Sequence, residues 1–407
     1  MLAEQFDAFL IDLDGVVHIG PDLLPGAAAA VRRLRQLGRH VRFVTNDPRP
    51  TRAQVRDRLT GLGVEASLEE VVTSGWATAH WLVEHGVTRA HVVGSGGLAQ
   101  ELAAQGVDPA SEKAVQAVVV GCDETLGYRD LEQASTLIRA GAQFVATNLD
   151  ATFPTPTGPW PATGAVVAAV AAGTGQRPMA IGKPAPAMFR LAQVGLPAPA
   201  RAVVVGDTPA SDIIGAHRAG LPAVLVDDNP SAAGPGAAEA TIPGLAGLFD
   251  PAVICHVRPA LAYPWPDGVR AGVAAVVLDD YGRVLLGRRA DNGLWGLPSG
   301  HVEAGETTTE AAMREVWEET GLQVQVMRLV GVYSEPTSQV FTYPDGRVIQ
   351  FITTSFACTP TGGQLRADGV ETTQVAFFAP DELPTDLLTM HPRWLTDALS
   401  GRAGAIG

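Results

Sequence analysis

Residues 300–322, GHVEAGETTTEAAMREVWEETGL, decide how the C-terminal part of the chain is interpreted, because a glycine precedes a predicted helix with an acidic face. On a helix, Glu315, Glu318 and Glu319 stand at positions i, i+3 and i+4, so three carboxylates crowd one face with no lysine among them. This crowding is unfavourable unless a cation neutralises it, and Mg²⁺ is held by carboxylates, water and substrate phosphates. The stretch therefore predicts a metal site, on a helix that ends at Gly321.

The same stretch resembles the Nudix box, because all fixed positions are filled with the required gaps of five and seven residues. The resemblance implies an α+β domain that cleaves a nucleoside diphosphate linked to another moiety. Glu315, Glu318 and Glu319 would hold Mg²⁺ or Mn²⁺, with Glu318 and Glu319 acting in catalysis. It also implies an orienting salt bridge between Arg314 and Glu306. The alternative for a glutamate-rich segment is a solvated surface helix. The fixed positions are Gly300, Glu306, Arg314, Glu315, Val316, Glu318, Glu319, Gly321 and Leu322.

Near the start of the chain, residues 7–12 read DAFLID, an apolar run typical of a buried parallel strand. Predicted helices and strands alternate after it, and the alternation resumes around residue 180, which indicates a doubly wound α/β sheet. In such sheets ligands bind at the carboxyl ends of the strands. The polar residues that follow predicted strands are Asp12, Asp14, Thr45, Asn46, Lys183 and Asp207.

These residues resemble the four motifs of the haloacid dehalogenase-like phosphohydrolases, over about residues 7–248. The long insertion between the second and third motifs is similar to subfamily IIA, the p-nitrophenyl phosphatase-like and phosphoglycolate phosphatase-like enzymes. The resemblance implies a Rossmann-like core, a large α/β cap and Mg²⁺-dependent hydrolysis of a phosphomonoester. The motifs are Asp12-Leu13-Asp14-Gly15-Val16, Thr45, Lys183, and Gly206-Asp207 followed by Asp212.

The resemblance also assigns roles to these side chains. A phosphate dianion repels a carboxylate, so Asp12 can act as nucleophile only beside a cation, and an aspartyl-phosphate is expected. Asp14 suits the roles of acid and then base. Thr45 and Lys183 would steady the phosphoryl oxygens. The remaining assignments are Mg²⁺ binding by Asp12, the backbone carbonyl of Asp14 and Asp207, substrate contact by Asn46 and Lys183, and orientation of Lys183 or a metal-bound water by Asp212.

Departures from the two patterns leave specificity open. Where the subfamily often carries a second asparagine, this chain has Asp47, whose carboxylate is unfavourable near phosphate unless it points away or pairs with Arg49. Outside the Nudix box, Glu371 is a candidate base or extra ligand, although a lone glutamate at a strand start is more often solvated. Four further residues are candidate substrate contacts, although each could equally have a structural role: Arg288, Arg289, Trp295 and Tyr343.

Length and composition limit the classes of protein. The 407 residues are typical of two to three domains, which we place as a core at 1–75 and 176–249, a cap at 76–175, a linker at 250–268 and a Nudix domain at 269–407. The net charge of −14 argues against nucleic acid as a partner, and no apolar run approaches the ~20 residues of a membrane span. The acidic stretch in the first residues indicates no signal peptide and a cytoplasmic protein.

The remaining expectations concern ligands and local structure. Small phosphorylated metabolites and nucleotide derivatives are the expected partners, and a homodimer is left open. Residues 153–164, FPTPTGPWPATG, are expected to form a loop, and residues 271–280 and 283–289 a hairpin. The three cysteines form no CxxC motif, so we expect neither disulfides nor a zinc site.

Two functions from different classes fit the sequence. In the first, both domains are active hydrolases, and they act in sequence if the monoester product of one is the substrate of the other. In the second, only the phosphatase is active and the Nudix domain is a ligand-sensing regulatory module. A sensor would not need the acids, and all of them are present, which favours two active hydrolases. The six acids are Asp12, Asp14, Asp207, Glu315, Glu318 and Glu319.

Overall fold

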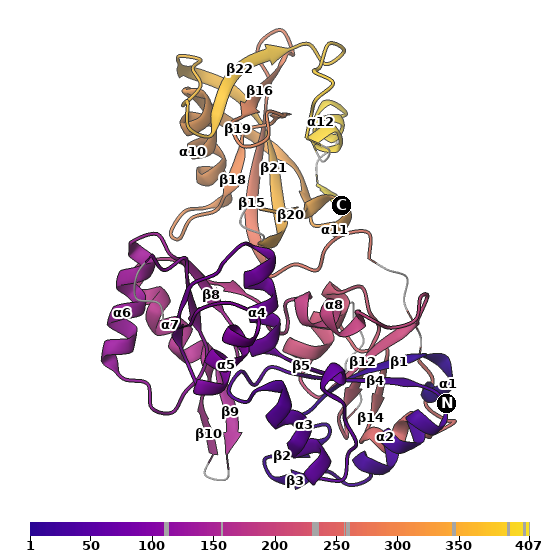
Figure 1. Cartoon of the computed structure of the whole chain (residues 1–407). Helices are drawn as coiled ribbons and strands as arrows, with labels where there is room; N and C mark the ends of the chain where they lie inside the picture. The colour runs from indigo at the N-terminus through magenta and orange to yellow at the C-terminus, as the bar shows by residue number, and fades with distance from the viewer. Residues whose placement is uncertain are drawn as a thin grey trace. The chain divides into compact units, whose positions relative to one another are not determined.

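The computed structural model forms two compact units, Met1–Ala260 and Leu261–Gly407, each of which is described by itself (Figure 1). Within the described part of the chain, no helix is long and apolar enough to cross a membrane. The three cysteines are free and buried. The structure describes all residues except 110–113, 156–157, 230–235, 256, 258–260, 344–346, 389–390, 402–403 and 407.

The N-terminal unit is built on a six-stranded parallel sheet in the order β14-β13-β12-β1-β4-β5. The chain leaves β1 toward β4 on one side and returns to β12 on the other, so the strand order reverses at β1. Ligands bind at such a reversal in open α/β sheets. The predicted doubly wound α/β core is thereby confirmed. The strands are β1 Ala8–Asp12, β4 His40–Thr45, β5 Val71–Thr73, β12 Ala202–Gly206, β13 Ala223–Val226 and β14 Ala240–Ile242.

Helices cover both faces of this sheet. Phe9 and Ile11 of β1 pack into one apolar cluster with α2 and α3, whereas Ala8 and Leu10 pack into a second cluster with α4, α8 and α9. Alternate residues of a strand point to opposite faces, so a strand buried on both faces reads as a continuous apolar run. The helices are α1 Leu2–Gln5, α2 Ala27–Gln36, α3 Arg52–Gly61, α4 Ser74–Glu84, α8 Ala187–Gln193 and α9 Ile214–Arg218.

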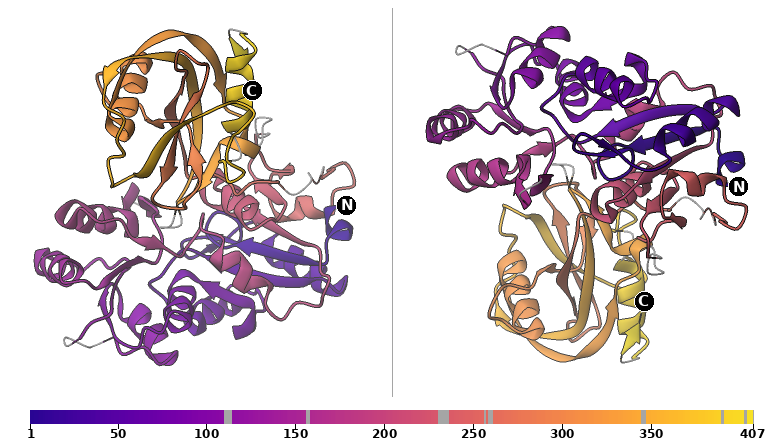
Figure 2. Two further views of the ribbon diagram at one scale, coloured as in Figure 1. Left: turned by 90° about the horizontal axis from the view of Figure 1, so that it is seen from above. Right: turned by 90° about the horizontal axis from the view of Figure 1, so that it is seen from below.

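The insertion between β5 and β12 contains a second parallel sheet, in the order β11-β8-β7-β6, which matches the expected α/β cap. Helices α6 and α7 lie side by side over one face of it (Figure 2), where Ile138 and Val170 pack against Val118 and Val120. The elements are β6 Ala90–Val93, α5 Gly96–Ala104, β7 Ala117–Val120, α6 Tyr128–Arg139, β8 Gln143–Ala146, α7 Thr163–Thr174 and β11 Met179–Ala180.

The loop expected at residues 153–164 is wrong in part. Strands β9 (Thr152–Thr155) and β10 (Gly158–Pro161) pair antiparallel, and α7 begins at Thr163. Proline removes a backbone donor, which a two-stranded sheet tolerates because each strand has an edge without a partner. The proline content therefore did not exclude strands here.

The C-terminal unit is a mixed sheet between two helices. The main sheet has the order β18-β15-β21-β19-β23, with β20 paired to β21, and a smaller sheet has the order β17-β16-β22. Val273 and Ala275 of β15 pack beneath α10, whereas Ala274 and Val276 pack with Trp394 of α12. The elements are β15 Gly268–Val277, β16 Val284–Arg289, β17 Trp295–Gly296, β18 Ser299–His301, α10 Thr308–Thr320, β19 Leu322–Tyr333, α11 Pro336–Gln339, β20 Val340–Thr342, β21 Val348–Gly363, β22 Thr372–Phe378, α12 His391–Leu399 and β23 Ala405–Ile406.

The expected hairpin of residues 271–280 with 283–289 is wrong in part. Both strands and the turn are present, and an antiparallel bridge joins Leu278 to Val284, but β15 then pairs with β18 and β21, and β16 pairs with β17 and β22. The second half of β15 is buried on both faces. A central strand of this kind takes partners along both edges, and β18 and β21 fill those places.

Candidate active sites

The polar residues predicted at the sheet edge come together in the N-terminal unit. Strand β1 ends at Asp12 and β4 ends at Thr45, while Asp207 directly follows β12. The three strands are neighbours and parallel, so their carboxyl ends meet at one edge. The sheet thus brings side chains from distant parts of the sequence to one place.

A buried ion-pair network lies at the centre of this edge. Lys183 Nζ donates to Asp12 Oδ1 and to Asp212 Oδ1, both at 2.6 Å. The three residues are 3%, 8% and 1% exposed, respectively. Burial alone would lower the pKa of Lys183, but the two carboxylates raise it above its usual range, so the ammonium form is stabilised. Burial raises the pKa of Asp12, against the effect of Lys183.

Three carboxylates converge at the same place. Asp12, Asp207 and Asp212 each offer an oxygen within 4.8 Å of the others, and Lys183 pairs with two of them, Asp12 and Asp212. A Cβ at Gly206 would collide with Asp212, and a Cβ at Gly15, where φ is +82°, would collide with Asp207. Hard oxygen donors with excess negative charge fit Mg²⁺. Asp212, for which the resemblance implied orientation of Lys183 or of a metal-bound water, thus contacts Lys183 and also lies among the carboxylates that could hold the metal.

The Asp14 side chain lies apart from that cluster. Its Oδ1 is 3.5 Å from Nδ1 of the buried His18. Burial raises the pKa of Asp14, nearby Asp47 raises it further, and His18 acts in the opposite direction. A carboxyl group with a raised pKa retains its proton closer to neutral pH, as a general acid requires.

The side chain of Asn46, in the loop after β4, forms hydrogen bonds within the protein, whereas the sequence predicted a contact with substrate. Its side-chain amide donates to Asp150 Oδ2 at 2.9 Å and to the Lys183 carbonyl at 3.0 Å, and its Oδ1 accepts from the Lys183 N–H at 2.8 Å. The amide donors are therefore used inside the protein, which favours a structural role over the predicted substrate contact. Asp47 takes one of the two predicted arrangements, because Arg49 contacts both of its oxygens, at 2.9 and 3.1 Å.

In the C-terminal unit, local sequence defines the acidic helix. Thr307 caps the start of α10 by accepting from the Glu310 N–H, and Gly321 ends it in the left-handed conformation at φ 70°. A Cβ at Gly300 would collide with the Glu315 carboxylate, so only glycine fits this approach. The helix boundaries and the glycine position thus follow from sequence.

Arg314 organises the acids of this helix. It contacts Glu306 at 2.8 Å, as predicted, and also Glu315 at 2.9 Å and Glu318 at 2.8 Å. In the described part of the chain, three carboxylates converge within 4.8 Å only in the N-terminal unit. The carboxylates of Glu315, Glu318 and Glu319 are suitable oxygen ligands for Mg²⁺. Two of them, those of Glu315 and Glu318, form ion pairs with Arg314.

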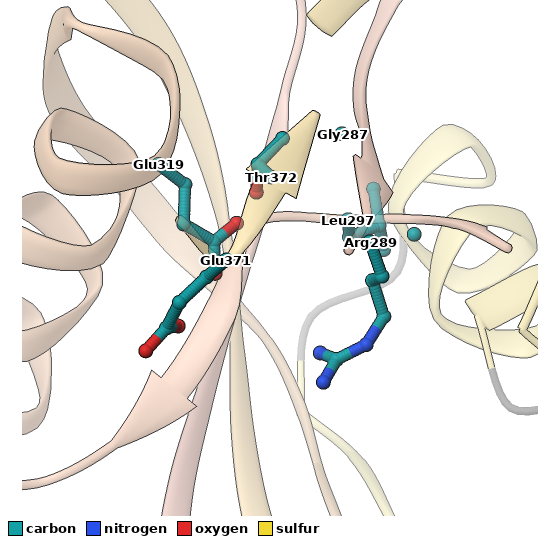
Figure 3. Close-up of a pocket in the computed structure, with 7 residues that line it drawn as sticks. Gly287, Arg289, Leu297, Glu319, Glu371 and Thr372 are labelled. Atoms are coloured by element: carbon teal, nitrogen blue, oxygen red, sulfur yellow. The ribbon is translucent and has the colours of Figure 1, made fainter. Parts of the chain in front are cut away.

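A pocket opens behind α10, where Glu319 and Glu371 lie on one side and Arg289 on the other (Figure 3). Burial raises the pKa of Glu319 to about 8, and the neighbouring Glu315 adds to the effect. The Ser299 N–H donates to Glu319 at 3.4 Å, and Arg289 pairs with Asp291 at 2.7 Å. The lining residues are Gly287, Arg289, Gly296, Leu297, Glu319, Glu371 and Thr372.

Two of the candidate substrate contacts, Arg288 and Trp295, are engaged within the protein. Arg288 donates to the Gly293 carbonyl at 3.0 Å, and Trp295 packs edge-on against Phe378. Neither lines the pocket, whereas Arg289 does. Their contact with substrate stays a prediction.

Comparison with known proteins agrees with both units. The family models "Haloacid dehalogenase-like hydrolase" and "HAD-hydrolase-like" match residues 9–108 and 180–243, and the model "NUDIX domain" matches residues 268–398. An acid sugar phosphatase of Staphylococcus aureus is 34% identical over 226 residues, which are 55% of this chain and 87% of that protein. The chain belongs to the haloacid dehalogenase-like hydrolases.

Further relatives of this haloacid dehalogenase-like hydrolase extend the comparison. D-glycerol 3-phosphate phosphatase of Mycobacterium tuberculosis is 42% identical over 229 residues, 55% of this chain, but the match spans only 64% of that protein. A glycerol phosphate phosphatase from the same species, solved with magnesium, has 38% identity and a TM-score of 0.56, covering 61% of this chain and 77% of that one. A 4-nitrophenylphosphatase from Thermotoga maritima has 29% identity and a TM-score of 0.57, covering 61% and 98%. The predicted fusion of a haloacid dehalogenase-like unit of the p-nitrophenyl phosphatase type with a C-terminal Nudix domain is confirmed.

Proposed function

We propose that the N-terminal unit hydrolyses small phosphomonoesters of polyols or sugars through an aspartyl-phosphate on Asp12. The observation that carries the proposal is the buried contact of Lys183 with Asp12 and Asp212, which holds a cation beside the nucleophile. The relatives named D-glycerol 3-phosphate phosphatase and acid sugar phosphatase support the polyol and sugar class.

The site residues fit a two-step displacement. An Asp12 oxygen attacks phosphorus, the bond from phosphorus to the alcohol oxygen breaks, and Asp14 gives its proton to that oxygen. Asp14 then takes a proton from water, whose oxygen attacks phosphorus and releases phosphate from Asp12. Lys183 and Thr45 stabilise the phosphoryl oxygens throughout. Mg²⁺ held by Asp12, Asp207 and the Asp14 backbone carbonyl would offset the negative charges that meet there.

We propose that the C-terminal unit hydrolyses a nucleoside diphosphate linked to another moiety. Glu319 and Glu371 face the same pocket, which supports Glu371 as the base that the Nudix box lacks. Mg²⁺ or Mn²⁺ held by Glu315, Glu318 and Glu319 would mask the diphosphate charge and lower the pKa of the attacking water. A domain reduced to ligand sensing would not need these carboxylates.

The test is to separate the two activities in the full-length protein with Mg²⁺. Asp12→Asn should abolish hydrolysis of phosphomonoesters and leave diphosphate cleavage intact, while Glu319→Gln should do the reverse. Loss of both activities from either substitution, in a protein that remains folded, would show one shared site instead of two. Diphosphate cleavage that is absent from wild type across a nucleotide panel would favour the sensing role.

The two reactions fit a sequence, because cleavage of a diphosphate yields phosphomonoesters. Supplied with a C-terminal substrate, wild type should release inorganic phosphate after a lag, and Asp12→Asn should stop at the monophosphate. If the N-terminal unit hydrolyses none of the products, the two activities are unrelated.

A further inference from the structure

The catalytic lysine reaches the core from the sheet of the insertion. Lys183 follows β11, which pairs with β8 of that sheet, whereas Asp12 and Thr45 end strands of the core sheet. The position of the ammonium group on Asp12 therefore depends on how the carboxyl edges of the two sheets are joined. Asn46, which directly follows Thr45, lies at that junction.

Asn46 holds the main chain of Lys183 at two points. Its Oδ1 accepts from the Lys183 N–H at 2.8 Å, and its Nδ2 donates to the Lys183 carbonyl at 3.0 Å. Both hydrogen bonds require one orientation of the Asn46 amide, with Oδ1 toward the Lys183 N–H and Nδ2 toward the Lys183 carbonyl. A flip of the amide by half a turn would place two acceptors together at one contact and two donors together at the other.

Asp150 selects that orientation. Its Oδ2 accepts from Asn46 Nδ2 at 2.9 Å. Burial raises the pKa of Asp150, but the hydrogen bond from Asn46 acts in the opposite direction and favours the ionised form, which can only accept, so Asp150 disfavours the flipped amide. Asp150 lies in the segment after β8, on the same sheet that delivers Lys183. One carboxylate thus ties the amide of the core loop to the insertion.

Further hydrogen bonds and one close approach fix the backbone around the junction. Asn148 Nδ2 donates to the Asn46 carbonyl at 2.7 Å, and the Asp150 N–H donates to Asn148 Oδ1 at 3.0 Å. The Gly164 N–H, at the start of α7, holds the Asp150 carbonyl at 2.8 Å. A Cβ at Gly182 would collide with the Thr147 carbonyl. The backbone of Asp150 is fixed on both sides, so its side chain is held toward Asn46.

We infer that Asp150 is a positioning residue for the phosphatase site: through Asn46 it fixes the main chain of Lys183, and thereby places Nζ between Asp12 and Asp212. The expected effect on kcat rests on the proposed phosphatase function. The expected effect on the position of Lys183 does not. This positioning role assigns a part in the reaction to a residue that acts through Asn46, and it makes the active site complete only when the insertion is docked.

Asp150→Ala and Asp150→Asn separate positioning from simple stabilisation. Alanine removes the acceptor, so kcat for phosphomonoesters should fall by about tenfold or more, with a smaller change in KM. Asparagine can still present a carbonyl oxygen to Asn46 Nδ2, so Asp150→Asn should restore most of kcat. Asp130→Ala is the matched control, because that aspartate holds only the Gly127 N–H at the start of α6 in the same insertion.

The sequence offers a second measurement that does not depend on activity. The chain has two lysines, Lys113 and Lys183. Acetylation of the full-length protein with an amine-reactive reagent, followed by mass spectrometry, therefore reports directly on Lys183, with Lys113 as the internal reference. Lys183 should be protected in wild type, Asp150→Asn and Asp130→Ala, and it should lose protection in Asp150→Ala.

The outcomes are distinct. Unchanged kcat or unchanged Lys183 protection in Asp150→Ala would overturn the inference, and so would an Asp150→Asn protein as impaired as Asp150→Ala. If wild type hydrolyses no phosphomonoester, the proposed function fails by itself, and the protection of Lys183 still decides whether Asp150 positions it.

Discussion

Glu319→Gln should remove a pH dependence from the stability of the C-terminal unit. Burial, with help from Glu315, raises the pKa of Glu319 from 4.5 to about 8 in the folded protein. Between these values the folded state holds a proton that the unfolded state has lost, so the metal-free protein must lose stability as pH rises. At about 1.4 kcal/mol for each pH unit, the loss over the interval reaches about 5 kcal/mol.

Hydrogen exchange read by mass spectrometry suits this prediction, because peptides from β15 report the opening free energy of the C-terminal unit separately from that of the other unit. Measured without metal from pH 5 to 8 and corrected for intrinsic exchange, wild type should lose protection with rising pH. Glu319→Gln should lose much less, since the amide does not titrate. Mg²⁺ should reverse the trend in wild type, because the metal requires the carboxylate.

The exposed Glu303 provides the control, since Glu303→Gln removes one carboxylate from the loop before the same helix. This variant should follow wild type at every pH. Equal slopes for wild type and Glu319→Gln would refute the reasoning, and a wild-type unit that gains stability from pH 5 to 8 without metal would refute it more directly.

Three further substitutions test single contacts. Gly206→Ala directs a methyl group at Asp212, so kcat/KM for phosphomonoesters should fall by about a hundredfold. Arg314→Lys replaces a forked guanidinium with a point charge, so diphosphate cleavage should fall by about tenfold while phosphomonoester hydrolysis is unchanged. Asp47→Asn removes the carboxylate paired with Arg49, so kcat/KM for carboxylate-bearing relative to neutral phosphomonoesters should rise by about tenfold.

Each of these three substitutions has a matched control. A Cβ at Gly96 would meet open space, so Gly96→Ala should be silent. Arg283→Lys and Asp57→Asn alter exposed ion pairs elsewhere in the same units and should also be silent. A fully active Gly206→Ala protein would contradict the close approach of β12 to Asp212. Unchanged activity of Arg314→Lys, or unchanged selectivity of Asp47→Asn, would show that the contact in question does not act on the reaction.

Much of the fold could be predicted because it depends on local patterns. The apolar run at residues 7–12 became a central strand, and the acidic helix ends at Gly321 as predicted. The carboxyl-edge rule then placed Asp12, Thr45 and Asp207 together without knowledge of any contact. Each of these inferences needs only neighbouring residues and one general rule about parallel sheets.

The parts that could not be predicted depend on pairings between distant segments. Asn46 meets Asp150 across 104 positions and Lys183 across 137, so nothing near Asn46 in sequence shows that its amide is already used. The same reason explains why the predicted hairpin does not extend beyond its turn, since the partners of β15 lie in other segments. Arg314 was assigned one carboxylate partner and has three, because sequence spacing does not limit how many acceptors a guanidinium serves.

In both sites a cationic side chain offsets the repulsion between crowded carboxylates, a lysine in the N-terminal unit and an arginine in the C-terminal unit. In the N-terminal unit the lysine lies within the carboxylate cluster and can stay there when a divalent ion binds, because Asp207 is not among its hydrogen-bond partners. In the C-terminal unit Arg314 contacts two of the three predicted ligands, so metal binding there must replace ion pairs and also remove the proton of Glu319. The ion pairs oppose the metal at every pH, and the proton opposes it below about pH 8. The affinity of the C-terminal site for its metal should therefore fall as the pH drops below about 8.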